Sequence, residues 1–298
     1  MTVTAVIVNY NAGGILRGLV EALAAEQLVA GVVVVDNASV DGSVDFLAAS
    51  SADTRVRLIR NDRNRGFAAG CNQGAALAHG SHILFINPDC RMRSGALAEL
   101  LAGVEARPDA AMAGPLILNT DGSEQRGCRR YLPDPRRALA RVLGFGGPDT
   151  NGRVAGFDLT GTPLPSEPVT VEAISGACML MKREAFTGVG GWDEGYFLHC
   201  EDLDICKRFG LQGLSILFVP EAVVAHVQGV SSRGRSVFVL WHKHRGMWRY
   251  FGKFQRAASP LWLTGLVWFG IWSRFIMLLP GAWLASLGAR RITGPHAA

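Results

Sequence analysis

Residues 32–43 read VVVVDNASVDGS, and this stretch decides the fold class. An unbroken run of valines is typical of a strand that is covered on both faces, as the strands of parallel sheets are. The run ends abruptly in an acid, an amide and small polar residues that favour a turn. In open α/β sheets the carboxyl ends of the strands border the ligand crevice, so we expect Asp36 to lie where a ligand binds.

The segments around this stretch alternate between strand and helix patterns. Strands are predicted at 3–10, 31–36, 56–61, 82–89 and 110–118, and helices at 15–28, 43–50, 70–79 and 94–106. This alternation is typical of βαβ units and predicts an α/β fold with a mostly parallel sheet flanked by helices. Further along we expect a helix near 135–143, a strand within 169–186, a helix at 201–210 and a strand pair at 214–220 and 222–227.

The composition indicates a globular cytoplasmic protein. A chain of 298 residues with 49% hydrophobic and 18% charged residues can form one large α/β domain plus an appendage. The net charge of +5 is concentrated at 242–256, where basic and aromatic residues alternate. The six cysteines show no C-x-x-C spacing and the N-terminus lacks signal-peptide features, so we expect free thiols, a reducing compartment and no cysteine zinc site.

The segment from Leu261 to Gly288 is apolar, with Arg274 as its one charge. Its length nearly suffices to span a bilayer. The position of Arg274, Pro280 within the segment and basic residues on both sides favour interfacial or hairpin attachment over a single crossing. A buried helical hairpin or an oligomer contact is the alternative.

Two polar segments follow predicted strands and suit a phosphate-bearing ligand. NRGFAAGCNQG at 64–74 offers backbone N–H groups and amides to a phosphate or a ribose, although Gly70 and Gly74 are equally explained by close helix packing. INPDC places Asp89 at a strand end, where a carboxylate can hold Mg²⁺ or Mn²⁺. The alternative is that Pro88 and Asp89 only form a turn.

The segment HCEDLDICKRFG predicts a helix whose first turn is acidic. Asp204 and Arg208 form an i,i+4 pair, which we assign to the solvated face. Glu201 and Asp202 flank the buried stripe, so either is a candidate base, although the helix dipole alone favours acids there. His226 follows an apolar strand and would complete a metal site beside Asp89, unless it is a structural histidine.

The order of these segments resembles family 2 glycosyltransferases of GT-A fold, and within them the rhamnosyltransferase-like branch. The resemblance rests on VIVNYN (6–11), VDNASVDGS (35–43), NRGFAAGCNQG (64–74), NPD (87–89), SGACMLMKREAF (175–186), VGGWDE (189–194), EDLDICKR (201–208) and HVQGVSS (226–232). It covers roughly residues 3–232 and implies a GT-A catalytic domain at 1–235. The basic, aromatic and apolar composition of 236–298 predicts a helical membrane-associating region.

The implied activity is inverting transfer of a sugar, typically from dTDP-L-rhamnose, to a hydroxyl of a glycan in bacterial cell-wall or surface polysaccharide assembly. The acceptor is often carried on a polyprenyl diphosphate. The resemblance therefore implies an enzyme at the cytoplasmic face of the cell membrane, peripheral or monotopic, with no nucleic-acid partner. Donors such as UDP-galactofuranose or UDP-GlcNAc are the first alternative.

The resemblance also implies roles for individual residues. Those assigned to the nucleotide-sugar are Tyr10, Asn11, Asp36, Arg65, Gly66, Asn72 and Asn87, with Asp36 at the pyrimidine base. Asp89 and His226 would bind Mg²⁺ or Mn²⁺, and Asp202 would be the catalytic base, with Glu201 as second choice. The family's D-x-D motif stands here as Asn87-Pro88-Asp89, and His199 replaces a usual aromatic residue.

Two functions from other classes compete with this one. Asp36 also lies where a Rossmann fold holds ribose, which would suit a nucleotide-dependent oxidoreductase, but the first turn NYNAGG lacks the glycine fingerprint. A non-enzymatic glycan-binding protein at the membrane would use the acids of 201–204 only as helix caps.

Overall fold

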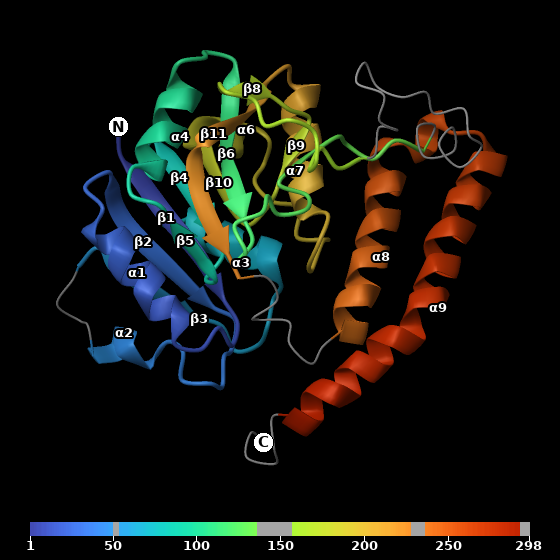
Figure 1. Cartoon of the computed structure of the whole chain (residues 1–298), viewed down its shortest axis with the longest axis horizontal. Helices are drawn as coiled ribbons and strands as arrows, with labels where there is room; N and C mark the ends of the chain where they lie inside the picture. Colours follow the sequence, from blue (N-terminus) through green and yellow to red (C-terminus); the bar gives the residue numbers. More distant parts are fainter. Residues whose placement is uncertain (50–53, 136–156, 228–235, 293–298) are drawn as a thin grey trace.

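A central mixed β-sheet with helices on both faces forms the body of the molecule, and a pair of long helices stands beside it (Figure 1). The computed structural model describes residues 1–49, 54–135, 157–227 and 236–292. The first half consists of β1 (Val3–Asn9), α1 (Ile15–Ala25), β2 (Val29–Asp36), α2 (Asp45–Ala49), β3 (Val56–Arg60), α3 (Phe67–Ala75), β4 (His82–Ile86), β5 (Cys90–Met92), α4 (Ala96–Glu105) and β6 (Ala110–Leu118). The second half consists of β7 (Arg129–Arg130), β8 (Val169–Thr170), β9 (Ala173–Ile174), β10 (Cys178–Lys182), α6 (Arg183–Gly188), α7 (Glu201–Leu211), β11 (Ser215–His226), α8 (Ser236–Phe254), a 3₁₀ turn (Arg256–Ala258) and α9 (Leu261–Ile292).

The strand order of the main sheet is β3-β2-β1-β4-β10-β6-β11-β5, with β8 added beside β11. Strands β3, β2, β1 and β4 are parallel, as the βαβ pattern predicts. Strand β10 then runs antiparallel to both β4 and β6, and β5 runs antiparallel to β11. The α/β fold is confirmed, and the antiparallel strands make its second half mixed.

Two predicted elements differ in the structure. The strand pair at 214–220 and 222–227 is one strand, β11, because the chain continues along β6 through a register shift between Val219 and Val223. The shift contains Pro220, which cannot donate to a ladder. The helix expected near 135–143 lies outside the described residues, apart from its first position.

Apolar side chains on the two faces of the sheet form separate cores. One core includes Ile7 of β1 and packs against α1 and α4, and the other includes Val8 of β1 and packs against α3, α6 and α7. A Cβ atom at Gly74 would lie 2.3 Å from Val6 Cγ1, and one at Gly70 would lie 2.8 Å from Val8 Cγ1. These glycines therefore serve close packing of α3 on β1.

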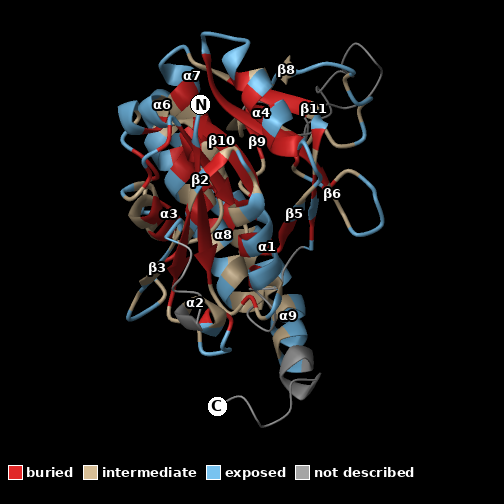
Figure 2. Ribbon diagram, turned by 90° about the vertical axis from the view of Figure 1, so that its left-hand side faces the viewer, coloured by how far each residue is buried: buried red, intermediate tan, exposed pale blue. Residues whose placement is uncertain are grey.

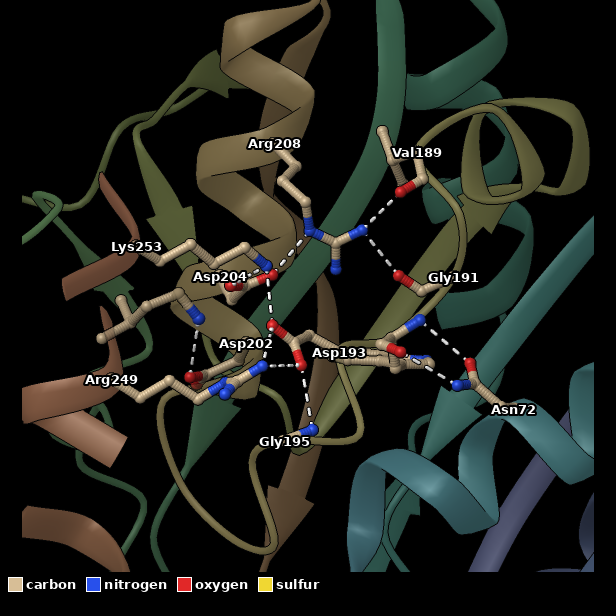
Figure 3. Close-up of polar contacts among 12 residues, drawn as sticks. Asn72, Val189, Gly191, Asp193, Gly195, Asp202, Asp204, Arg208, Arg249 and Lys253 are labelled. Atoms are coloured by element: carbon tan, nitrogen blue, oxygen red, sulfur yellow. Dashed lines mark hydrogen bonds and ion pairs between the residues drawn. The ribbon is translucent and has the colours of Figure 1, made fainter. Parts of the chain in front are cut away.

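Helix α8 packs against α7 and the loop before it through a third, smaller core that includes Tyr196, Cys200 and Tyr250. Asp204 takes part in this contact and is fully buried. It accepts from Arg208 Nε at 2.6 Å, as the i,i+4 spacing predicts, and from Lys253 Nζ of α8 at 2.7 Å (Figure 3). The prediction that Asp204 is solvated is wrong, because α8 covers that side of α7.

Helix α9 packs along α8 through Leu263 and Ile271, which are buried. Its remaining surface is open to solvent, in contrast to the buried sheet (Figure 2). Among the described residues, Leu261–Leu287 is the one helical stretch long and apolar enough to cross a membrane, and 11% of its most apolar window is buried. Arg274 is turned toward α8, where its Nη1 lies 3.0 Å from His244 Nε2.

Candidate active site

A cavity of about 570 Å³ opens at the carboxyl ends of the parallel strands. Seven residues predicted from the sequence line it: Tyr10, Gly66, Asn87, Asp89, Glu201, Asp202 and His226. They come from β1, the loop before α3, the turn after β4, the start of α7 and the end of β11. A volume of this size is typical of small-molecule sites.

The pairing of β5 with β11 brings Asp89 and His226 together. In this ladder Cys90 is opposite His226, and the Val227 N–H donates to the Asp89 carbonyl oxygen at 3.1 Å. Asp89 Oδ1 consequently lies 3.1 Å from His226 Nε2, although the residues are 137 positions apart. Both side chains are buried.

Gln125 fixes the tautomer of His226. The Gln125 amide nitrogen donates to Asn119 Oδ1 at 3.0 Å and to the His226 carbonyl oxygen at 3.3 Å, so Gln125 Oε1 is the acceptor for His226 Nδ1 at 2.7 Å. In a neutral imidazole this leaves the Nε2 lone pair facing the Asp89 carboxylate. The arrangement needs a proton or a cation between the two atoms.

A divalent cation fits this pair. Two ligand atoms about 2.1 Å from an octahedral ion and at right angles lie about 3.0 Å apart, close to the Asp89–His226 distance. The Cys90 sulfur is also near, but burial raises the pKa of this thiol well above its usual value and it donates to the Ala177 carbonyl oxygen. Cys90 is therefore a protonated neighbour, and Asp89 and His226 are the candidate ligands for a cation.

Two carboxyl groups at the start of α7 differ in their protonation state. Burial and the neighbouring Asp202 raise the pKa of Glu201 to about 8. Burial also acts against ionisation of Asp202, but the Arg130 guanidinium outweighs it and lowers the Asp202 pKa. Arg130 Nη2 lies 2.5 Å from Asp202 Oδ2. At neutral pH Asp202 is thus the ionised member of the pair and Glu201 is largely protonated.

The backbone just before α7 is strained. His199 and Cys200 both have positive φ, 69° and 72°, which costs non-glycine residues about 1–3 kcal/mol each. This conformation turns the chain so that His199, Glu201 and Asp202 all line the cavity. Burial and the nearby Lys243 lower the His199 pKa to about 4, so this imidazole is neutral.

The structure does not bring Asp36 to the cavity wall. Its carboxylate is buried and accepts from Asn9 Nδ2 at 2.9 Å and Ser39 Oγ at 2.5 Å. Asp36 thereby organises the turn at 37–43, and Asn37 lines the cavity in its place. The sequence predicted the strand end correctly but could not show that the side chain turns inward.

Three other predicted residues lie outside the lining of this cavity. Asn11 borders a neighbouring cavity of about 450 Å³ that shares Asp89 with the first. Arg65 is half-exposed and pairs with Asp62 at 3.3 Å. Asn72 bonds both the N–H and the carbonyl of Trp192 at 2.9 Å, so it ties α3 to the loop before α7 (Figure 3).

The cavity residues that sequence reasoning missed include Gln125, Arg130 and Lys243. Arg130 belongs to an arginine-rich segment that reads as irregular structure, and its excess of positive charge was the available signal. Gln125 has no such signal, because its role depends on where β11 ends. Lys243 lies on α8, which sequence reasoning assigned to the membrane-associating region.

The close approach of α8 to the site depends on Gly246. A Cβ atom there would lie 2.8 Å from the His199 carbonyl oxygen and 3.3 Å from Cys200 Sγ. We expect Gly246→Ala to displace α8, to lower the free energy of unfolding by about 1–3 kcal/mol and to reduce the activity of the site. Gly252→Ala on the same helix meets no atom within 4 Å and is the control, expected to be neutral or stabilising. Equal melting temperatures of the two variants would contradict this packing.

Comparisons with known proteins agree with the geometry. Residues 4–188 match the family described as Glycosyl transferase family 2. An N-acetylglucosaminyl-diphospho-decaprenol L-rhamnosyltransferase of Mycobacterium tuberculosis is 29% identical over 267 residues, which cover 82% of this chain and 85% of that protein. Rhamnosyltransferase WbbL of Escherichia coli is 29% identical over 181 residues, 59% of this chain and 63% of WbbL. Among solved structures, the fold is similar to that of the mannosyltransferase PcManGT from Pyrobaculum calidifontis in complex with GDP-Man and Mn²⁺. The TM-score is 0.56 at 16% identity, and the alignment covers 99% of this chain and 76% of the PcManGT chain.

Proposed function

Because the chain belongs to glycosyltransferase family 2, we propose that it transfers L-rhamnose from dTDP-L-rhamnose, with inversion, to a hydroxyl of a lipid-linked glycan. The observation that carries the proposal is one cavity lined by the Asp89–His226 pair and by Asp202 with its partner Arg130. The relatives named as rhamnosyltransferases support the sugar, and the decaprenol-linked substrate in one of these names supports the acceptor.

In this mechanism Asp202 accepts the proton of the attacking acceptor hydroxyl. A sugar hydroxyl is not ionised at neutral pH, so a base that removes its proton in the transition state contributes about 10²–10⁴-fold. Arg130 keeps Asp202 ionised and oriented. The hydroxyl oxygen forms a bond to the anomeric carbon while the bond to the nucleoside diphosphate breaks on the opposite face, which inverts the configuration.

Asp89 and His226 are proposed to hold Mg²⁺ or Mn²⁺ near the leaving diphosphate. A cation held at this position would neutralise charge that develops on the leaving group. Gln125 orients His226 through its Nδ1, as outer partners of metal-binding histidines do. Mn²⁺ in the PcManGT complex, a protein with a similar fold, supports this assignment.

For the nucleotide end of the donor we propose Tyr10, Asn37 and Gly66, which line the cavity next to the carboxyl ends of β1 and β2. Asn37 is held by its amide, which donates to the Gly66 carbonyl oxygen at 3.1 Å and accepts from Asn61 at 2.9 Å. Asp36 is buried behind this part of the cavity wall, where it organises the turn at 37–43. Arg65 stays a proposed contact for the donor, since it is half-exposed at the entrance to α3.

A donor screen by thermal shift tests the proposed function. We expect dTDP-L-rhamnose with Mn²⁺ to raise the melting temperature more than UDP-galactofuranose, UDP-GlcNAc or GDP-mannose, because ligand binding to the folded state stabilises it. Radiolabelled transfer to a GlcNAc-diphospho-lipid then tests the reaction. A shift with NAD alone would overturn the proposal in favour of an oxidoreductase, and binding without transfer to any acceptor would favour a glycan-binding protein.

We further propose that the chain divides into a catalytic domain, 1–235, and a membrane-associating region, 236–298, at the cytoplasmic face of the membrane. Exposed apolar side chains along α9 support this: Trp262, Trp268, Phe269, Ile276, Met277, Trp283 and Leu284. Arg274 does not oppose it, since its guanidinium faces His244 of α8. Tryptophans with flanking basic residues are typical of helices that lie at a membrane interface.

Charge on the outer face of α9 is expected to abolish membrane binding. Phe269 and Ile276 are 64% and 66% exposed, so Phe269→Glu with Ile276→Glu leaves the α8 contact intact. Each acidic group costs about 2.5 kcal/mol or more on entering hydrocarbon. Sedimentation with anionic vesicles measures the loss. Leu211→Glu, at a 65% exposed position of α7, is the control; equal binding by all three proteins would contradict attachment through α9.

A further inference from the structure

Helix α8 forms part of the cavity wall. Phe238, Val239 and Lys243 line the cavity together with the residues of the catalytic domain. The family match ends at residue 188, so this part of the wall lies outside the matched segment. A helix that contributes side chains to the reaction cavity has a role beyond attachment.

The Lys243 side chain has no ion-pair or hydrogen-bond partner within the described parts of the chain. This distinguishes it from two other cations of the same helix. Arg249 Nη2 donates to Asp193 Oδ1 at 2.7 Å, and Lys253 Nζ lies 2.7 Å from both Asp193 Oδ2 and Asp204 Oδ2 (Figure 3). These three ion pairs fix the C-terminal half of α8 on α7 and the loop before it. Lys243 lines the cavity with its charge uncompensated.

The surroundings of Lys243 are positively charged. Partial burial and then the nearby Arg274, Arg126 and Arg130 lower its pKa, which means that the site disfavours a further cation. Arg126 is paired with Asp158 and Arg130 with Asp202, so neither carboxylate is left for Lys243. Such a site attracts an anion.

Lys243 also lies between the proposed base and the proposed membrane helix. On one side it is close enough to His199 to lower the pKa of that imidazole, and His199 lies in the strained turn that leads into Asp202. On the other side the next residue, His244, contacts Arg274 of α9. An acceptor that reached Asp202 from the side of α9 would therefore come near Lys243.

We propose that Lys243 binds the diphosphate of a lipid-linked acceptor, with Arg126 and Arg130 in the same cavity lining. The inference rests on the proposed function, because it takes the acceptor to be a sugar on a lipid diphosphate. The donor diphosphate has a separate site at Asp89 and His226. Phe197, Phe238 and His242 add an aromatic cluster beside Lys243, with Phe197 and His242 stacked at 4.5 Å, that suits the first apolar part of the lipid.

Calorimetry with geranyl diphosphate tests the anion site without any sugar. We expect Lys243→Ala to weaken binding roughly tenfold to hundredfold, as loss of a charge-assisted hydrogen bond does. Arg245→Ala is the matched control, because Arg245 is an exposed cation on the same helix whose side chain has no partner among the described residues and does not line the cavity. Its affinity is expected to match that of the unmodified protein.

Kinetics with two acceptors shows whether Lys243 binds the diphosphate of the acceptor or that of the donor. With a GlcNAc-diphospho-lipid we expect Lys243→Ala to raise the acceptor KM by a similar factor, with the donor KM unchanged. With a neutral alkyl GlcNAc glycoside the variant is expected to behave like the unmodified protein. A rise in the donor KM would assign Lys243 to the donor, and equal geranyl diphosphate affinity of Lys243→Ala and Arg245→Ala would overturn the site. If no sugar is transferred by the unmodified protein but the calorimetric difference holds, the proposed function fails and the anion site stands.

Discussion

Asp202→Asn is expected to lower kcat by about 10²–10⁴-fold and to leave the affinity for dTDP-L-rhamnose nearly unchanged. Asn cannot take the proton of the acceptor hydroxyl, so the loss falls on the chemical step. The substitution keeps the size of the side chain, and an amide oxygen can still accept from the Gly176 N–H, which lies 3.3 Å from Asp202 Oδ2. Initial rates of sugar transfer give kcat, and calorimetry gives the affinity of the variant for the donor.

Glu201→Gln is the matched control for this experiment. Glu201 is largely protonated at neutral pH, since its pKa is about 8, and Gln resembles the protonated form. We therefore expect Glu201→Gln to retain most of the activity. If Glu201→Gln is inactive and Asp202→Asn retains its rate, Glu201 is the base.

Asp89→Ala is expected to reduce transfer about 10³-fold, because the cation proposed to bind there would contribute several kcal/mol at the leaving diphosphate. EDTA is expected to cause a similar loss in the unmodified protein and no further loss in the variant. Titration with Mn²⁺, followed by calorimetry, measures the site without turnover and is expected to show no binding to Asp89→Ala.

Cys90→Ala is the control for the metal site. The Cys90 thiol is buried and its pKa is raised, so we expect the variant to bind Mn²⁺ like the unmodified protein. A comparable loss in Cys90→Ala would mean that the sulfur is a ligand. Full activity of Asp89→Ala in the presence of EDTA would exclude a metal-dependent reaction.

The sequence predicts most of the fold because its elements are encoded locally. The valine run of β2 and the apolar stripes of α1 and α4 are visible as patterns, and the structure confirms them. The end of β6 at Leu118 also agrees with the predicted segment. Helix ends differ by a few residues, which is where local patterns are least informative.

The site is predicted in part, and the missing part depends on tertiary contacts. Asp89, Asp202 and His226 line one cavity, as their positions at element ends indicate. Asp36 turns inward because Asn9 and Ser39 donate to it, and a hydrogen-bond direction of this kind has no periodic signature. Asp204 is buried because α8 returns across α7, which no pattern within 201–211 can indicate.

The consecutive positions of Lys243 and His244 on α8 bear on how far an acceptor must extend from the membrane to the cavity. With α9 embedded in the membrane interface as proposed, the thickness of α8, about 10 Å, would separate α9 from the cavity. A short carrier-bound saccharide can span that gap while its hydrocarbon tail stays in the leaflet, whereas a long oligosaccharide would extend past the base. The enzyme would then search for its acceptor in two dimensions, at a local concentration far above that in bulk solution.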